Sequence, residues 1–286
     1  MDWKISDDRT DAVITARKHI ASSHGGSVPQ LPETCIIFEM GMAIPFVEEN
    51  FPAYTITQHI PGFITDSKCI GIAGNRRVCF VRGGYGAPAA VDTLETLLDL
   101  GVKRIIGMGM CGGFSEDIHV GDVVVPRRIF CEEGTSQHYL GNVENVMADE
   151  DIQKALTAHF SKNFNVLESP TVSTDAVYRQ TMAKEEVWRS RGCAAVDMES
   201  SALLSVCQYY SVPAAIALIC SDRHPLPNEK NNWNWGSSSG DTGVSSISRS
   251  TSVRCGRRSC SSSATYATRW RTRVLGIPAL TAYMDI

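Results

Sequence analysis

Two carboxylates interrupt the apolar stretch "CAAVDMESSALLSVCQYY" at residues 193–210. The spacing of its apolar residues predicts a helix from Val196 to Val206 that packs on the core. Such a helix accounts for Asp197, because an acid in the first helical turn interacts favourably with the macrodipole. Glu199 would instead face the packing surface, where a carboxylate is costly unless it accepts hydrogen bonds. Either a sugar with neighbouring hydroxyls provides these bonds, or Glu199 is a helix-start residue in solvent.

A third acid, Asp222, follows the apolar run "AAIALIC" at residues 214–220, where a buried strand would end. An Asp at this place has two interpretations. It faces a ligand beyond the end of the strand, or it caps the turn that follows. Spacing alone leaves both interpretations open.

The elements that must position these acids are visible as short apolar runs that end in glycines. These runs are 34–44, 76–86 and 104–114, with a helical stripe of Val91, Leu94, Leu97 and Leu98 that ends at Gly101. Further strands are expected in 121–130 and 214–222, and further helices in 5–23 and 149–160. This alternation predicts an α/β fold: a single domain over residues 1–235, with a central mixed, mostly parallel sheet flanked by helices. In such sheets ligands bind beyond the carboxyl ends of the strands, here at Gly83–Gly86, Gly107–Gly113 and Ser221–Asp222.

Composition excludes several classes of protein. The 286 residues are 43% hydrophobic and 20% charged, as in ordinary globular proteins, and the net charge of −4 gives no reason to expect nucleic acid as partner. No apolar stretch approaches the roughly 20 residues of a membrane span, and the start "MDWKISDDRTDAV" has acids where a signal peptide needs a basic and then an apolar run. We therefore expect a cytoplasmic protein without a membrane partner. Ten cysteines occur without a CxxC pair and the histidines lack ligand spacing, so we also expect reduced thiols and no metal.

Residues 236–286 have a different character. Serine dominates 237–263, seven arginines fall between Arg249 and Arg273, and apolar periodicity is absent. Such a composition argues against a packed element, so we expect a disordered Ser/Arg-rich tail. Aromatic residues are too few and unpatterned to indicate RNA binding. Because a helix should cover the sheet here, we interpret the tail as an altered reading of the gene, through a shifted frame or a mis-joined exon.

Four segments between residues 76 and 224 resemble the purine nucleoside and uridine phosphorylase family, which also includes purine nucleosidases. They are "GYGAPAAVDTLETLLDLGVKRII", "GMGMCGGFSEDIHVGDVVVP" with "EEGTSQHYL", "STDAVYRQT", and "VDMESSALL" with "ICSD". The most specific is the Met-Glu pair, followed by a helix and then by Ser-Asp. The order and spacing of all four segments argue against a chance match.

The resemblance implies roles for the acids. In this family the Glu after Met, here Glu199, accepts hydrogen bonds from the ribose hydroxyls, and Met198 packs against the sugar. A carboxylate can bind two adjacent hydroxyls, and its charge favours the oxocarbenium-like transition state of N-glycosidic cleavage. The Asp of the Ser-Asp pair, here Asp222, protonates or hydrogen-bonds N7 of the departing base in purine-cleaving members. Uridine-cleaving members lack this Asp, so the resemblance favours a purine.

Other positions are implied around the base. The position that usually places a Phe beside the base holds Val177, which weakens stacking. Tyr178, Arg179 and Gln180 either line the base or cover the sheet edge. His138 matches a family feature on the loop after the fifth strand, although a lone His is more often structural.

The family's phosphate site is the part that this chain lacks. The family uses arginines from three places and a hydroxyl residue, but "FEMGMAI" and the segment before Gly71 hold no Arg, and the remaining positions align with Gly107 and Met110. Phosphate bound without arginine forks should be held weakly. What is left for an anion is a nest of backbone N–H groups, which we place at Gly84, Gly86, Gly109 and Met110.

Nucleosidases of the family use water in place of phosphate and a Glu as general base. That position is Ala43 here, and Glu39, four residues earlier, could substitute. Three hypotheses therefore stand: a nucleoside phosphorylase-like pentosyltransferase of nucleoside salvage, a phosphate-independent nucleosidase, and a non-catalytic nucleoside-binding relative. The whole-chain resemblance favours the first, which would cleave a purine nucleoside or uridine to free base and ribose 1-phosphate. It would need no cofactor, take phosphate as co-substrate, and form a homodimer or a ring of dimers through the N-terminal helix and the loop near His59.

Overall fold

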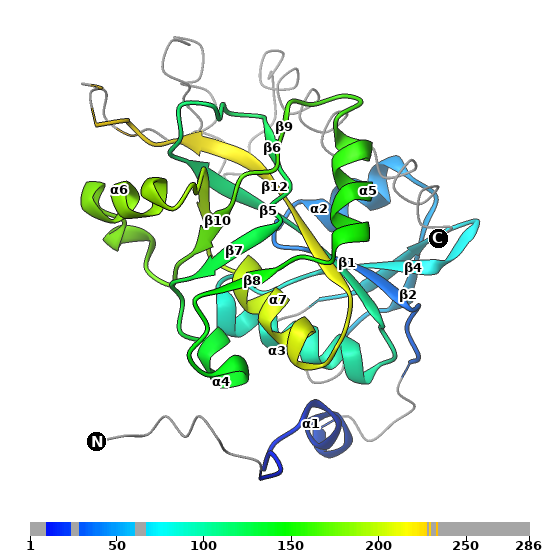
Figure 1. Cartoon of the computed structure of the whole chain (residues 1–286). Coiled ribbons are helices and arrows are strands. Elements are labelled where there is room, and N and C mark those ends of the chain that lie inside the picture. Colours follow the sequence, from blue (N-terminus) through cyan, green and yellow to red (C-terminus); the bar gives the residue numbers. More distant parts are fainter. Residues whose placement is uncertain (1–9, 24–28, 61–66, 228, 230–232, 234–286) are drawn as a thin grey trace, which may run out of the picture.

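In the described part of the chain, twelve strands of this computed structural model form one mixed sheet with helices on both of its sides (Figure 1). The structure describes residues 10–23, 29–60, 67–227, 229 and 233, so the Ser/Arg-rich tail from 236 lies outside the described residues. The strands are β1 (Thr34–Phe38), β2 (Ala53–Thr57), β3 (Cys69–Ile72), β4 (Asn75–Arg82), β5 (Arg104–Gly113), β6 (Val123–Val124), β7 (Arg128–Cys131), β8 (Asn145–Met147), β9 (Val166–Leu167), β10 (Thr171–Ser173), β11 (Ala195–Asp197) and β12 (Ala214–Arg223). The helices are α1 (Ala16–Ser23), α2 (Ala43–Asn50), α3 (Ala87–Asp99), α4 (Ser136–Leu140), α5 (Glu150–Phe160), the 3₁₀ turn η1 (Val177–Arg179), α6 (Met182–Ser190) and α7 (Ser200–Tyr209).

Strand β5 is the centre of the sheet, because three strands pair with it. Strand β12 runs parallel to it along one edge. On the other edge β1 pairs in parallel as far as Met108, and β11 pairs antiparallel at Gly112 and Gly113. Among the described strands, none pairs with β5 between Met108 and Gly112 on that edge. The candidate active site lies at this interruption.

Two branches of the sheet continue from β1 and β11. Strands β4, β3 and β2 follow β1, and β10, β7 and β8 follow β11. The strands β4, β1, β5 and β12 are mutually parallel, whereas β2, β3 and β8 each pair antiparallel with a neighbour. All five positions of β1 are buried, which is typical of a parallel strand covered on both faces and explains its continuous apolar run. The predicted α/β class with a mixed sheet is confirmed.

Helices α3 and α7 pack against each other on one side of the sheet, and α5 packs against β12 on the other (Figure 1). Helix α3 begins with a proline in its first turn, where the missing N–H costs nothing. It buries Val91, Leu94 and Leu97, which belong to the predicted stripe. It ends before Gly101, whose φ of 105° favours glycine.

The stretch 193–210 folds differently from the prediction. Ala195–Asp197 form strand β11 between β10 and β5, and α7 begins at Ser200 rather than at Val196. Asp197 ends the strand and starts the helix, because its Oδ2 accepts the N–H of Ser200 at 2.8 Å and that of Glu199 at 3.3 Å. The predicted helix started too early because all three residues of β11 are buried, as are most residues of α7, so burial does not separate the strand from the helix.

Two other boundaries also differ from the prediction. Helix α1 begins at Ala16 rather than at residue 5, because Thr15 Oγ1 accepts the Lys18 N–H at 3.2 Å and starts the helix there. The first residues of the predicted helix, 5–9, lie outside the described residues. The segment 121–130 forms two strands, β6 and β7, instead of one, and Pro126 between them has no N–H for a sheet ladder.

Candidate active site

A cavity of about 520 Å³ lies beside β5 where its pairing with β1 and β11 is interrupted, and the end of β12 also lines it. Its walls include Glu39 after β1, Met110 on β5, the turn Val196–Glu199 and Asp222 near the end of β12. The carboxyl ends of parallel strands therefore meet here, as expected for a ligand site in such a sheet. Glu199 and Asp222 reach the cavity from β11 and β12, which pair with opposite edges of β5. The structure thus brings together the two acids that the sequence singled out.

Glu199 sits between β11 and α7 and is only 7% exposed. Its Oε1 accepts the N–H of Gly86 at 2.7 Å, so the turn before α3 is fixed to this carboxyl group. Burial and the charge of Asp197 raise the pKa of Glu199 to about 8, more than this N–H lowers it. Met198 lies beside it in the cavity wall. The carboxyl group is placed to accept further hydrogen bonds from a ligand with hydroxyls.

Asp222 is turned into the cavity by an irregularity in β12. The pairing with β5 shifts between Cys220 and Asp222, as in a β-bulge, which re-aims a side chain. The Asp222 carboxylate accepts Ser221 Oγ–H at 2.6 Å and Trp233 Nε1–H at 2.7 Å, and His224 Nε2 lies 3.4 Å away. Burial would raise the pKa of Asp222, but these three donors together lower it. Its donors are side chains, whereas an Asp that caps a turn accepts from a backbone N–H.

Two glycines of the predicted anion nest, Gly84 and Gly86, contact neighbouring backbone or a carboxyl group, and the adjacent Gly83 faces the Glu39 carboxyl group. A side chain at Gly83 would lie 2.1 Å from Glu39 Oε1, so the Glu39 carboxyl group fills the space beside it. The Gly86 N–H is bound by Glu199, and Gly84 packs against Ala89 of α3. Gly109 and Met110 lie within β5, and Met110 alone of these nest residues lines the cavity.

The Glu39 carboxyl group is itself unusual. Both of its oxygens are buried, and neither has a hydrogen-bond partner among the described residues. Burial and the charges of Glu199 and Asp197 raise its pKa well above the ordinary range, against the opposing charge of Arg82. Because an unpaired buried polar group is costly, this side chain is better suited to a site that a ligand or water occupies.

The family model for the phosphorylase superfamily matches residues 33–239. The chain belongs to this superfamily. The match spans every segment on which the sequence resemblance rested, so that prediction is confirmed.

The chain matches relatives over different shares of their length. Guanosine phosphorylase of Halorubrum lacusprofundi is 30% identical over 124 residues, which are 43% of this chain and 52% of that protein. A DeoD-type purine nucleoside phosphorylase of Brevibacillus brevis is 26% identical over 219 residues, which are 74% of this chain and 88% of that protein. The crystal structure of purine nucleoside phosphorylase from Toxoplasma gondii in complex with immucillin-H superposes with a TM-score of 0.60 at 20% identity, over 69% of this chain and 84% of that one. The chain described here therefore spans about half the length of the guanosine phosphorylase. It shares the fold of the Toxoplasma gondii enzyme.

The residues predicted around the base are only partly at the cavity. Val177, Tyr178 and Gln180 line it, near the 3₁₀ turn η1, whereas Arg179 does not. Val177 is 42% exposed and Tyr178 is 96% exposed, so they form the rim rather than the floor. His138 lies on α4 and is likewise outside the cavity lining.

The segment "EEGTSQHYL" anchors the helix behind Glu199, a role that the sequence analysis did not assign. The fully buried Glu133 accepts the Ser136 N–H at 3.0 Å and the Ser201 Oγ–H at 2.8 Å. Ser205 Oγ donates to Ser136 Oγ at 2.7 Å. Because Ser201 and Ser205 belong to α7, this buried network holds the start of that helix in place.

Two further cavity residues, Glu185 and His224, were missed by the sequence analysis. His224 stands two residues after Asp222, and this proximity in sequence was the one signal that could have indicated His224 as a cavity residue. Glu185 lies in α6, and no pattern there marks it as different from its exposed neighbour Glu186.

The described residues contain no group of three or more His, Cys, Asp or Glu side chains that could hold a metal ion. The cysteines in this part of the chain are free, and seven of the eight are buried. No helix among the described residues has both the length and the apolar character that crossing a membrane demands.

Proposed function

We propose that this chain is a nucleoside phosphorylase-like enzyme that cleaves the N-glycosidic bond of a purine nucleoside and releases the free base. The observation that carries the proposal is the placement of Glu199 and Asp222 on one cavity of a superfamily member. The cavity volume of about 520 Å³ is in the range of small-molecule sites. The names of two relatives, guanosine phosphorylase and purine nucleoside phosphorylase, support a purine substrate over uridine.

In this proposal each end of the nucleoside has its own acid. Glu199 binds the ribose hydroxyls and Met198 packs against the sugar, whereas Asp222 binds the N7 side of the base. Val177, Tyr178 and Gln180 cover the base from the rim. The negative charge of Glu199 favours the oxocarbenium-like transition state, which carries positive charge on the sugar.

Phosphate is the proposed co-substrate, and the reaction requires no cofactor. A phosphate oxygen bonds to C1′ of the ribose while the electron pair of the C1′–N9 bond leaves with the base. We also propose, from superfamily membership, that the protein acts in nucleoside salvage in the cytoplasm as a homodimer or a ring of dimers.

Hydrolysis is the second candidate, and the Glu39 carboxyl group favours it. This group occupies the space beside Gly83, next to the predicted anion nest, and both of its buried oxygens lack a hydrogen-bond partner among the described residues. A water molecule bound there would satisfy an oxygen and, by hydrating the group, would favour its ionised form, which can act as general base. A phosphate dianion would instead meet a carboxyl group where the family has arginines.

Base release from inosine, guanosine and uridine, with and without phosphate, separates these candidates. Phosphorolysis predicts strict dependence on millimolar phosphate and release of ribose 1-phosphate. Hydrolysis predicts undiminished release in phosphate-free buffer, free ribose as product, and a large loss of rate in Glu39→Gln but not in the exposed control Glu116→Gln. Nucleoside binding without base release in either buffer would contradict both candidates and indicate a non-catalytic relative.

A further inference from the structure

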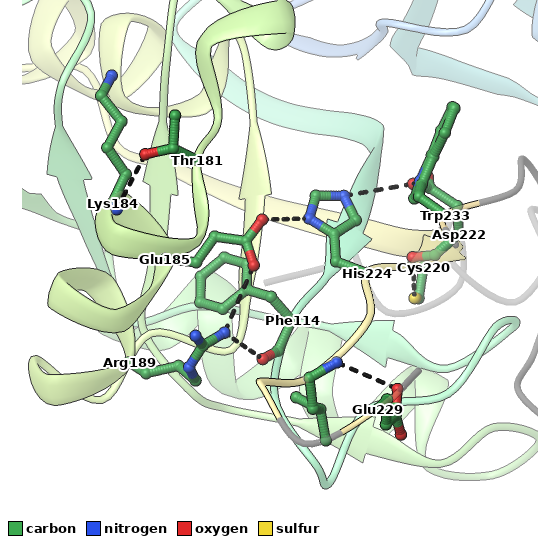
Figure 2. Close-up of polar contacts among 11 residues, drawn as sticks. Phe114, Thr181, Lys184, Glu185, Arg189, Cys220, Asp222, His224, Glu229 and Trp233 are labelled. Atoms are coloured by element: carbon green, nitrogen blue, oxygen red, sulfur yellow. Dashed lines mark hydrogen bonds and ion pairs between the residues drawn. The ribbon is translucent and has the colours of Figure 1, made fainter. Parts of the chain in front are cut away.

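A continuous chain of polar side chains runs from the cavity to helix α6 (Figure 2). His224 lies between two carboxylates, with Nδ1 at 2.7 Å from Glu185 Oε1 and Nε2 at 3.4 Å from Asp222 Oδ2. Glu185 Oε2 in turn lies 3.4 Å from Nη1 of Arg189, which also donates to the carbonyl oxygen of Phe114 at 3.2 Å. Asp222, His224 and Glu185 all line the cavity, so the chain of contacts begins where the substrate would bind.

The imidazole is held in one orientation. Its side chain is 13% exposed, and those of Asp222 and Glu185 are each 6% exposed. A side chain at Gly112 would lie 2.4 Å from His224 Nε2, so this glycine on β5 gives the ring its place. The ring therefore cannot turn away from Asp222 without losing the bond to Glu185 as well.

The charges around the ring favour its protonated form. Asp222 faces it from β12 and Glu185 from α6, where Arg189 balances part of the charge of Glu185. The adjacent Arg223 is engaged with Glu229 at 3.0 Å. Burial would lower the pKa of His224, but hydrogen bonds and charges from Asp222 and Glu185 raise it to about 9.

This arrangement bears on how the base departs. The purine leaves with the electron pair of the C1′–N9 bond and is a poor leaving group unless it gains a proton. The lowered pKa of Asp222 means that its carboxylate is ionised at neutral pH and has no proton of its own to give. Of the three side chains that face the Asp222 carboxylate, Ser221, Trp233 and His224, only His224 carries a readily transferable proton, on Nε2.

We propose that His224 holds the proton taken up by the departing purine and passes it through Asp222. The proposal rests on the proposed function and applies to attack by phosphate or by water. As the C1′–N9 bond breaks, the proton on His224 Nε2 moves to Asp222 and a proton moves from Asp222 to N7 of the base. His224 is left neutral, with Nδ1–H still donated to Glu185, and regains a proton from solvent. His224 acts through Asp222 and is a positioning residue, and Glu185 fixes its orientation.

A comparison of two leaving groups tests this role. His224→Gln should lower kcat for inosine by about 10²–10⁴-fold, the range for loss of general acid catalysis. The same variant should retain most of its rate on 4-nitrophenyl β-D-ribofuranoside, because 4-nitrophenolate leaves without a proton. An equal loss on both substrates would show that His224 is only structural and would overturn the proposal. His119→Gln, at an exposed surface histidine, is the matched control and should keep both rates.

The pH profile gives a second readout. With inosine, kcat of the parent chain should fall as pH rises through about 9, because the imidazolium is the required form. In Glu185→Gln this fall should move to lower pH, since one of the two carboxylates that hold the proton is gone. A profile that is identical in parent and Glu185→Gln would contradict the proposal.

A measurement without turnover separates this proposal from the proposed function. In NMR spectra of the full chain labelled with ¹⁵N-histidine, the resonance that is missing in His224→Gln should titrate near pH 9. A neutral His224 at pH 7 would overturn the proton-holding role even if inosine is cleaved. A charged His224 in a chain that cleaves no nucleoside would refute the proposed function, and this proposal with it.

Discussion

At the scale of single residues, the two acids that face the substrate differ because their partners differ. Glu199 is buried and lies near the charge of Asp197, so its pKa is raised to about 8 although its carboxyl group accepts the Gly86 N–H. Asp222 receives donors from three side chains, and its pKa is lowered. At neutral pH Asp222 is therefore ionised, whereas Glu199 takes its negative charge when hydroxyl donors and the positive sugar of the transition state face it.

Glu199→Gln should make the protein more stable at alkaline pH. The ordinary pKa of a Glu is 4.5, so between pH 4.5 and about 8 the unfolded state loses this proton and the folded state keeps it. The stability contributed by the protonated group is therefore present below pH 4.5 and is lost as pH rises to about 8. Gln has no such loss, so urea unfolding should show a stabilising effect at pH 8.5 that is absent at pH 4.5. An equal effect at both pH values, or the same effect in the exposed control Glu186→Gln, would contradict this account.

At the scale of elements, the junction between β11 and α7 decides where Glu199 points. Asp197 accepts the Ser173 Oγ–H at 2.5 Å and the Ser200 N–H at 2.8 Å, so it joins β10, β11 and the start of α7. The buried bonds of Glu133 hold the same helix from the other side. The carboxyl group of Glu199, the residue just before α7, is thus positioned by elements that are distant in sequence.

Asp197→Ala should cost about 1–3 kcal/mol of stability, because a helix start and a buried hydroxyl lose their acceptor. It should also lower nucleoside turnover strongly, since Glu199 is no longer held. Asp149→Ala is the matched control: its Oδ1 caps α5 through the Ile152 N–H at 3.0 Å, away from the cavity. That variant should lose about 1 kcal/mol and keep full turnover. Thermal unfolding and steady-state rates check both variants, and full turnover in Asp197→Ala would be the contradicting result.

The elements were predictable where burial and periodicity agree. The apolar runs of β1 and β12 and the stripe of α3 predicted those elements, and the strand-end rule placed Asp222 at the ligand-binding edge of the sheet. The position of Glu199 followed from the family resemblance and not from this rule. The start of α7 was predicted too early, because the residues of β11 are as buried as those of the helix. The contact between His224 and Glu185 joins residues 39 apart in sequence, and neither helical nor strand spacing can report it. The position of the Glu39 carboxyl group beside Gly83 depends on the pairing of β1 with β4, which a single sequence does not specify.

At the scale of the whole molecule, the cavity is walled by the sheet on one side and by exposed aromatic residues at its rim. Tyr85 and Tyr178 line it although they are 76% and 96% exposed. Large exposed aromatic side chains next to a ligand site are typical of surfaces that a partner covers. This arrangement fits the proposed homodimer or ring of dimers.

Light scattering of the purified chain should therefore give a multiple of its mass of 31.2 kDa. A particle of 31.2 kDa that is fully active at the assay concentration would contradict the proposed oligomer.

Tyr178→Ala should raise KM for nucleoside, because it removes part of the cavity rim.

The most direct test of the central claim is the steady-state release of purine base from inosine and guanosine by the full chain, with Glu199→Gln alongside. We expect the parent chain to release base from both and to act more slowly on uridine. Glu199→Gln should lose about 10²–10³-fold in kcat, the cost of removing one preorganised electrostatic partner. Its circular dichroism spectrum should match that of the parent. No base release by the parent chain, or equal rates in the parent and Glu199→Gln, would contradict the account.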